Sequence, residues 1–121
     1  MKIMVSQAGQ DKKMTVVALE GRIDALAADE VLATLRKAVN KGSHHLVINM
    51  AHATFISSSG LRVLLSIAKL IHQVGGTLLL ANLSPRVRKV FIVSDLEDLF
   101  TFHDNVEQAL ASHGMARDES A

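Results

Sequence analysis

The fold is decided by the stretch from residue 46 to residue 74, LVINMAHATFISSSGLRVLLSIAKLIHQV. It opens at residues 46–50 with LVINM, a short and nearly all apolar run that is typical of a strand buried on both faces of a parallel sheet. From Leu61 the apolar residues recur every three and four positions, which predicts a helix that ends at Gly75-Gly76. A buried strand that leads through a serine-rich turn into so apolar a helix predicts an α/β domain.

Strand and helix patterns alternate along the rest of the chain. Two short apolar segments, residues 3–7 and 14–20, predict an antiparallel hairpin. The further expected elements are a helix from Asp24 to Gly42, a buried strand at 77–81, a helix capped by Ser84 with Pro85 at its first position, a short strand at 100–102, and a last helix with capping-box spacing between Asp104 and Glu107.

This order predicts one mixed, mainly parallel sheet of four to five strands flanked by about four helices. The domain is expected to span residues 1–112. The remaining residues, 113–121, are polar and small and are expected to form a frayed tail.

Composition narrows the possible functions. Thirteen Lys and Arg residues nearly balance twelve Asp and Glu residues, and aromatics make up only 3%, so the basic field and the stacking platforms of nucleic-acid binders are missing. The chain has no cysteine, which excludes disulfides and thiolate chemistry, and its six histidines lack the spacing of a metal site. No glycine-rich nucleotide motif is found, so no cofactor is expected.

The sequence also lacks the features of an exported or membrane protein. The N-terminal residues do not have the pattern of a signal peptide. No stretch approaches the roughly 18 uninterrupted apolar residues that a membrane helix needs. We therefore expect a cytoplasmic protein that contacts neither the membrane nor nucleic acid directly.

Three serines at residues 57–59 precede Gly60, where the predicted strand passes into the apolar helix. Taken alone, these residues favour helix capping, for which serine is well suited. A second interpretation is a phosphorylation switch, because unpaired N–H groups at a helix start favour an anion and a phosphate adds about −1.5 to −2 charge. A serine nucleophile is a third, but Ile56 stands where the glycine-x-serine-x-glycine elbow needs its first glycine. Asp24 is expected to cap the helix that begins directly after it or to line the same end of the sheet as the serines.

Three segments together resemble the STAS domain, and specifically the bacterial anti-sigma factor antagonists. They are VALEGRID at residues 17–24, FISSSGLRVL at 55–64 and VRKVF at 87–91, and the resemblance covers roughly residues 3–112. It implies a mixed sheet flanked by helices. It also implies a partner switch and not an enzyme: the unphosphorylated protein binds an anti-sigma factor that is also a serine kinase, which frees a sigma factor, and phosphorylation switches this binding off.

The resemblance also implies where the site lies. By position in the family's D-S-[ST]-G-L motif, the phosphoacceptor is Ser58, with Ser57 as the alternative. Ser57 stands where the motif has aspartate, which removes one acidic side chain beside the acceptor and adds a competing hydroxyl. The residues expected to form the environment of the phosphosite and the partner-binding surface are Asp24, Ser57, Ser59, Gly60, Leu61 and Arg62.

The implied partners are the anti-sigma factor serine kinase and a PP2C-type phosphatase that resets the switch, and the free protein is expected to be a monomer. The alternative is a non-phosphorylated STAS subunit of a transporter or of a stressosome-like signalling complex. The missing aspartate at position 57 motivates this alternative.

Overall fold

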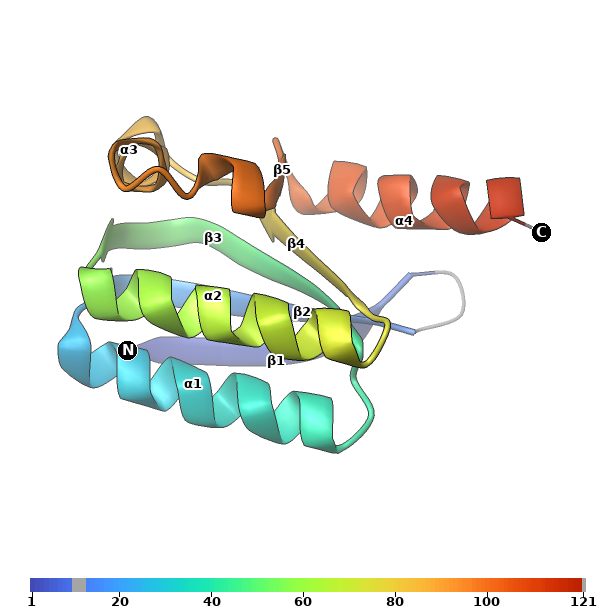
Figure 1. Ribbon diagram of the computed structural model, residues 1–121, viewed down its shortest axis with the longest axis horizontal. Coiled ribbons are helices and arrows are strands. Elements are labelled where there is room, and N and C mark those ends of the chain that lie inside the picture. The colour runs from blue at the N-terminus through green and yellow to red at the C-terminus, as the bar shows by residue number, and fades with distance from the viewer. Residues whose placement is uncertain (10–12, 121) are drawn as a thin grey trace.

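The protein forms a five-stranded sheet with helices on both faces (Figure 1). The computed structural model describes residues 1–9 and 13–120, with side chains as far as residue 113. In chain order the elements are β1 (Lys2–Ala8), β2 (Met14–Ile23), α1 (Ala25–Asn40), β3 (His45–Ile56), α2 (Ser58–Gln73), β4 (Thr77–Ala81), α3 (Pro85–Val93), the short 3-10 turn η1 (Glu97–Leu99), β5 (Thr101–His103) and α4 (Val106–Ser120).

The strands lie side by side in the order in which they occur in the chain, β1 to β5. β1 pairs with β2 in the antiparallel direction, and the other three pairs are parallel. This is the single α/β domain with a mixed sheet that the sequence predicts. Among the described residues, no helix is long and apolar enough to cross a membrane.

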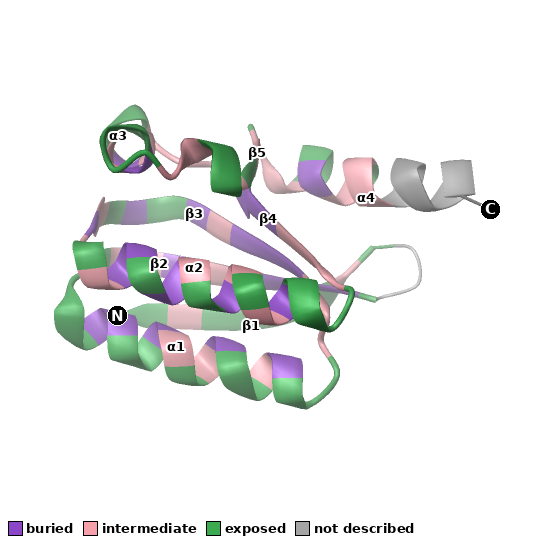
Figure 2. Cartoon of the chain, viewed as in Figure 1, coloured by how far each residue is buried: buried purple, intermediate pink, exposed green. Residues whose placement is uncertain are grey.

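The central strands are buried on both faces, because α1 and α2 cover one face of the sheet and α4 packs on part of the other (Figures 1 and 2). Successive side chains of a strand point to opposite faces. Accordingly Leu46 and Ile48 of β3 join the cluster with α1 and α2, and Val47 between them joins the cluster with α4. All three are fully buried, which confirms the two-sided burial predicted for this strand.

β3 is much longer than the strand predicted at 46–50. It keeps pairing with β2 through two register shifts, and at each of them β3 carries one more residue than its partner. Such bulges break the alternation on which strand prediction depends, so residues 51–54 do not show a strand pattern. His52 lies in this extension of β3, opposite Glu20. The extension carries the strand as far as Ile56, directly before the serines.

Other boundaries differ from the predictions by smaller amounts. α2 begins at Ser58, three residues before the predicted start, and β5 begins at Thr101 and follows η1. α4 is capped by Asn105, whose side-chain oxygen accepts a hydrogen bond from the Gln108 N–H at 2.8 Å, and not by Asp104. α4 then continues to Ser120, so the backbone expected to fray from residue 113 is helical there.

The three phenylalanines near the end of the chain fasten α3 to the sheet. The ring of Phe91 on α3 meets the rings of Phe100 and Phe102 edge-on, at centroid distances of 5.3 and 5.4 Å. Phe91 is fully buried, whereas its neighbour Ile92 is 53% exposed. Edge-to-face pairs of this kind add about 0.5–1.5 kcal/mol beyond the burial of their apolar area.

Phe91→Ala is therefore expected to lower the free energy of unfolding by about 3–5 kcal/mol, because it removes a fully buried aromatic side chain and leaves a cavity. Urea denaturation followed by circular dichroism measures this loss. The matched control is Ile92→Ala on the same helix, which should cost about 1 kcal/mol or less. Equal losses in the two variants would contradict the packing described here.

Candidate functional site

The candidate site lies at the carboxyl end of the sheet, where α1 and α2 begin side by side (Figure 1). Ile23, the last residue of β2, is in register with Ile56, the last residue of β3. The backbone N–H of Ser57 then donates a hydrogen bond to the carbonyl of Ile23 at 2.9 Å. The structure therefore brings Asp24 and Ser57, the residues that follow the two strands, to neighbouring positions.

Asp24 and Ser57 play the same local role, each as the N-cap of the helix that follows it. A carboxylate oxygen of Asp24 accepts a hydrogen bond from the Ala27 N–H at 2.9 Å, and the Ser57 hydroxyl accepts one from the Gly60 N–H at 3.1 Å. Aspartate and serine are about equally good N-caps. Serine at position 57 therefore fulfils the capping role that aspartate would fill there, and its hydroxyl is already engaged.

Ser58 and Ser59 form the start of α2. The Ser58 side chain is exposed and that of Ser59 is half-buried. In the part of the chain that the structure describes, no hydrogen bond engages the Ser58 hydroxyl. The first turn of a helix also has backbone N–H groups without partners in the helix, so an anion at Ser58 meets favourable electrostatics.

Gly60 is buried and fits against the ends of two strands. A methyl group built on its Cα would lie 2.7 Å from Cγ1 of Ile56 and 2.9 Å from Cγ2 of Ile23, closer than carbon atoms pack. The next residue, Leu61, is 4% exposed and belongs to the core. These two motif residues therefore hold the first turn of α2 against the sheet, which presents Ser58 to solvent.

Gly60→Ala is expected to lower the free energy of unfolding by about 1–2 kcal/mol, because the added methyl overpacks the contact with the two isoleucines. In an uncrowded helix the same change would stabilise by up to about 1 kcal/mol, so even the sign of the effect is informative. Thermal and urea denaturation provide the measurement, with Ser59→Ala at the adjacent position as the control. An unchanged or raised stability in Gly60→Ala would disprove the close contact.

Several residues beside the serines escape sequence analysis. The guanidinium of Arg22 stacks over the ring of Phe55 at 4.3 Å, and the two residues are in register on β2 and β3. The shifted register that joins them cannot be read from the chain. Leu26, in the first turn of α1, is 82% exposed. This leucine could have been noticed, because it lies outside the apolar stripe of its helix.

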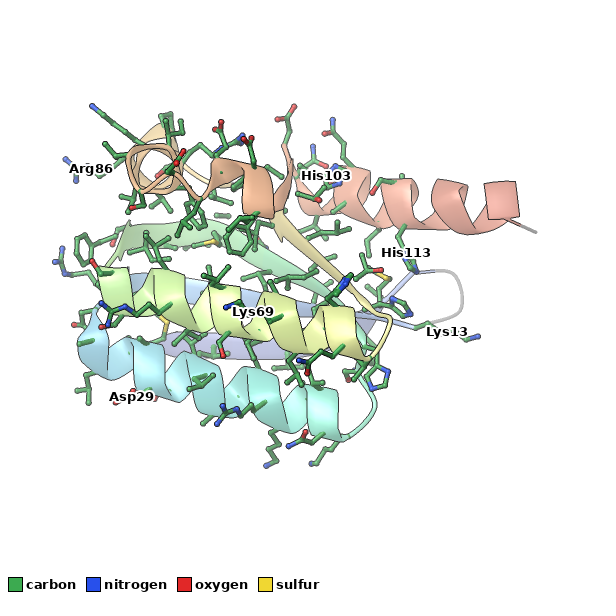
Figure 3. All side chains as sticks on the ribbon, in the orientation of Figure 1. Lys13, Asp29, Lys69, Arg86, His103 and His113 are labelled. Carbon is green, nitrogen blue, oxygen red and sulfur yellow. The ribbon has the colours of Figure 1, made fainter. Side chains whose placement is uncertain are left out.

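The geometry gives no support to a serine nucleophile at this site. The contact recorded for the Ser57 hydroxyl is the capping bond, and within the described residues no histidine side chain is hydrogen-bonded to any of the three serines. A serine–histidine contact does occur elsewhere, between Ser112 on α4 and Nε2 of His103 at 3.1 Å (Figure 3). The same hydroxyl also lies 2.8 Å from the carbonyl of Ala109, and neither Ser112 nor His103 belongs to the candidate site. No group of three or more potential metal ligands is found among the described residues.

A family model described as the STAS domain matches residues 5–109. The chain belongs to the STAS domain family. This confirms the resemblance carried by the segments around Asp24, the serines and α3. The match covers the sheet and both helices that begin at the candidate site.

Curated relatives of this STAS domain have related names. BtrV of Bordetella bronchiseptica, named as an anti-sigma factor antagonist, is 36% identical over 99 residues, which cover 82% of this chain and 85% of that protein. The anti-sigma F factor antagonist of Paenibacillus polymyxa is 31% identical over 96 residues, covering 78% of this chain and 82% of that protein.

Solved structures agree with this assignment. The anti-sigma factor antagonist SpoIIAA in its unphosphorylated form matches with a TM-score of 0.77 and 25% identity, covering 93% of this chain and 97% of that one. SpoIIAA of Bacillus, described as a cell fate determinant, in its phosphorylated form matches with a TM-score of 0.70 and 25% identity over 92% and 98%. This STAS domain therefore resembles a protein whose structure is known in both states.

Proposed function

We propose that this STAS domain is an anti-sigma factor antagonist controlled by phosphorylation of Ser58. The unphosphorylated form binds an anti-sigma factor that is also a serine kinase, and this binding frees a sigma factor. The observation that carries the proposal is Ser58 itself: an exposed serine at the first position of α2, next to its cap, in a chain whose relatives are named anti-sigma factor antagonists.

The environment of the serines favours Ser58 over Ser57 as the acceptor. The Ser57 hydroxyl is half-buried and accepts the capping bond from Gly60, so a kinase would have to break that contact to reach it. The Ser58 hydroxyl is exposed. A phosphate on Ser58 would also lie at a helix N-terminus, which stabilises negative charge, so the fold tolerates the modification.

Phosphorylation then changes the affinity for the partner and leaves the fold as it is. A phosphate adds negative charge and bulk at a surface that Asp24, Ser59 and Arg62 border. At a protein contact that charge is either repelled or desolvated, and both effects weaken binding. The protein acts in the cytoplasm as a kinase substrate and binding partner, is monomeric when free, and is reset by a PP2C-type phosphatase.

The alternative of an unphosphorylated subunit in a larger complex loses part of its motivation. It depends on the absence of aspartate at position 57. Serine is an equally good N-cap and fills that role through its hydrogen bond to Gly60. The substitution therefore leaves the start of α2 intact for a kinase to recognise.

The first test is phosphorylation itself. The protein is incubated with ATP and the anti-sigma factor kinase of its own organism, and the peptide that spans residues 55–62 is analysed by mass spectrometry. One phosphate is expected in the wild type and in Ser57→Ala, and none in Ser58→Ala. Phosphate on Ser57 in the wild type, or no phosphate at all, would overturn the proposal.

The second test is partner binding. Ser58→Asp is expected to weaken binding of the kinase at least about tenfold, because it introduces a negative charge at the contact. Isothermal titration calorimetry measures the affinity, and Ser58→Ala, which changes size but not charge, should stay within about threefold of the wild type. If Ser58→Asp binds as tightly as Ser58→Ala, charge at this position does not control the interaction.

A further inference from the structure

Arg62 has no structural role that accounts for its presence. Its side chain is exposed, and it forms no hydrogen bond, ion pair or ring contact with any of the described residues. Two other arginines are engaged: Arg88 forms an ion pair with Glu97 at 3.2 Å and lies over the ring of Phe102 at 3.6 Å, and Arg22 stacks on Phe55. Arg36 and Arg86 are exposed without such contacts to described residues, as Arg62 is, but neither of them lies near the serines in the sequence. Arg62 is therefore an exposed cation on α2 that is not engaged by other described residues.

Arg62 lies where its side chain can reach Ser58. The two residues are four apart on α2, and both are exposed. Residues at this spacing are neighbours on one helix face, and a long helical side chain lies back over the turn that precedes it. The guanidinium of Arg62 can therefore reach over the first turn of α2, where Ser58 lies.

Phosphorylation would place a negative group at Ser58, four residues before the positive charge of Arg62. A negative group placed four residues before a positive one stabilises a helix more than the reverse arrangement does. An arginine also matches a phosphate geometrically, since two parallel N–H groups can donate to two of its oxygens. The neighbouring carboxylate of Asp24 opposes a second negative charge, which increases the value of a nearby cation.

We propose that Arg62 is the internal counter-ion of phosphorylated Ser58. In the unphosphorylated protein its guanidinium is open to solvent or to a partner, and in the phosphorylated protein it pairs with the phosphate. One modification then changes two features of the docking surface, because a negative group appears and an arginine is withdrawn. The inference rests on the proposed function only in taking Ser58 as the acceptor.

The test uses protein that carries phosphoserine installed at position 58 during translation, so that no kinase is needed. The second ionisation of the phosphate is followed by phosphorus NMR between pH 4.5 and 7.5, around its usual value of about 6. Arg62 favours the doubly charged form, so Arg62→Gln should move the midpoint up by about 0.2–0.4 pH unit. Adding 1 M salt should remove most of this difference, because it reduces the screening length to about 3 Å.

The matched control is Lys69→Gln, which removes an exposed cation from the same helix (Figure 3). Lys69 lies eleven residues beyond Ser58, or about 16 Å along the axis, outside the screening length at physiological salt. Its midpoint should equal that of the wild type. No change in Arg62→Gln, or the same change in both variants, would overturn the proposal. Such a result would leave phosphorylation of Ser58 untouched, whereas a failed kinase assay would remove the acceptor on which the inference rests, so the two failures are distinguishable.

Discussion

The structure depends on the parallel pairing of β2 with β3 as far as their last residues. Ile23 and Ile56 end in register, and the hydrogen bond from the Ser57 N–H to the Ile23 carbonyl continues the ladder by one step. Because both chains leave the sheet at the same level, α1 and α2 begin side by side. The two caps, the buried Gly60 and the exposed Ser58 all take their places from this one alignment.

Sequence patterns were sufficient for the elements that obey a single period. The apolar run at 46–50 and the stripe that follows Leu61 gave a buried strand and a covered helix, and both are present. The patterns failed where contacts between distant residues determine the extent or the register of a strand. The two bulges hide the second half of β3, and the stacking of Arg22 on Phe55 follows from a shifted register that only the folded sheet defines.

Within the candidate site, the resemblance to the STAS family identified the motif, and the structure gives each residue a physical task. Ser57 departs from the family motif, and this departure motivated the alternative of a non-phosphorylated subunit. The hydrogen bond from the Gly60 N–H shows that this position accepts from the helix, a task that serine and aspartate perform about equally well. What the motif requires physically is a cap, a residue without a side chain and an exposed hydroxyl between them.

The parallel start of α1 and α2 has a further consequence, for the persistence of the signal. Two helices that run side by side in the same direction have parallel macrodipoles, each equivalent to roughly half a positive charge at its amino end, and these ends repel each other. The Asp24 carboxylate, which caps α1, already offsets part of that repulsion. A phosphate on Ser58 would meet the positive end of α2 and, against it, the charge of this carboxylate. In the proposed switch, the lifetime of the phosphate on Ser58 is therefore set by the enzymes that add and remove it.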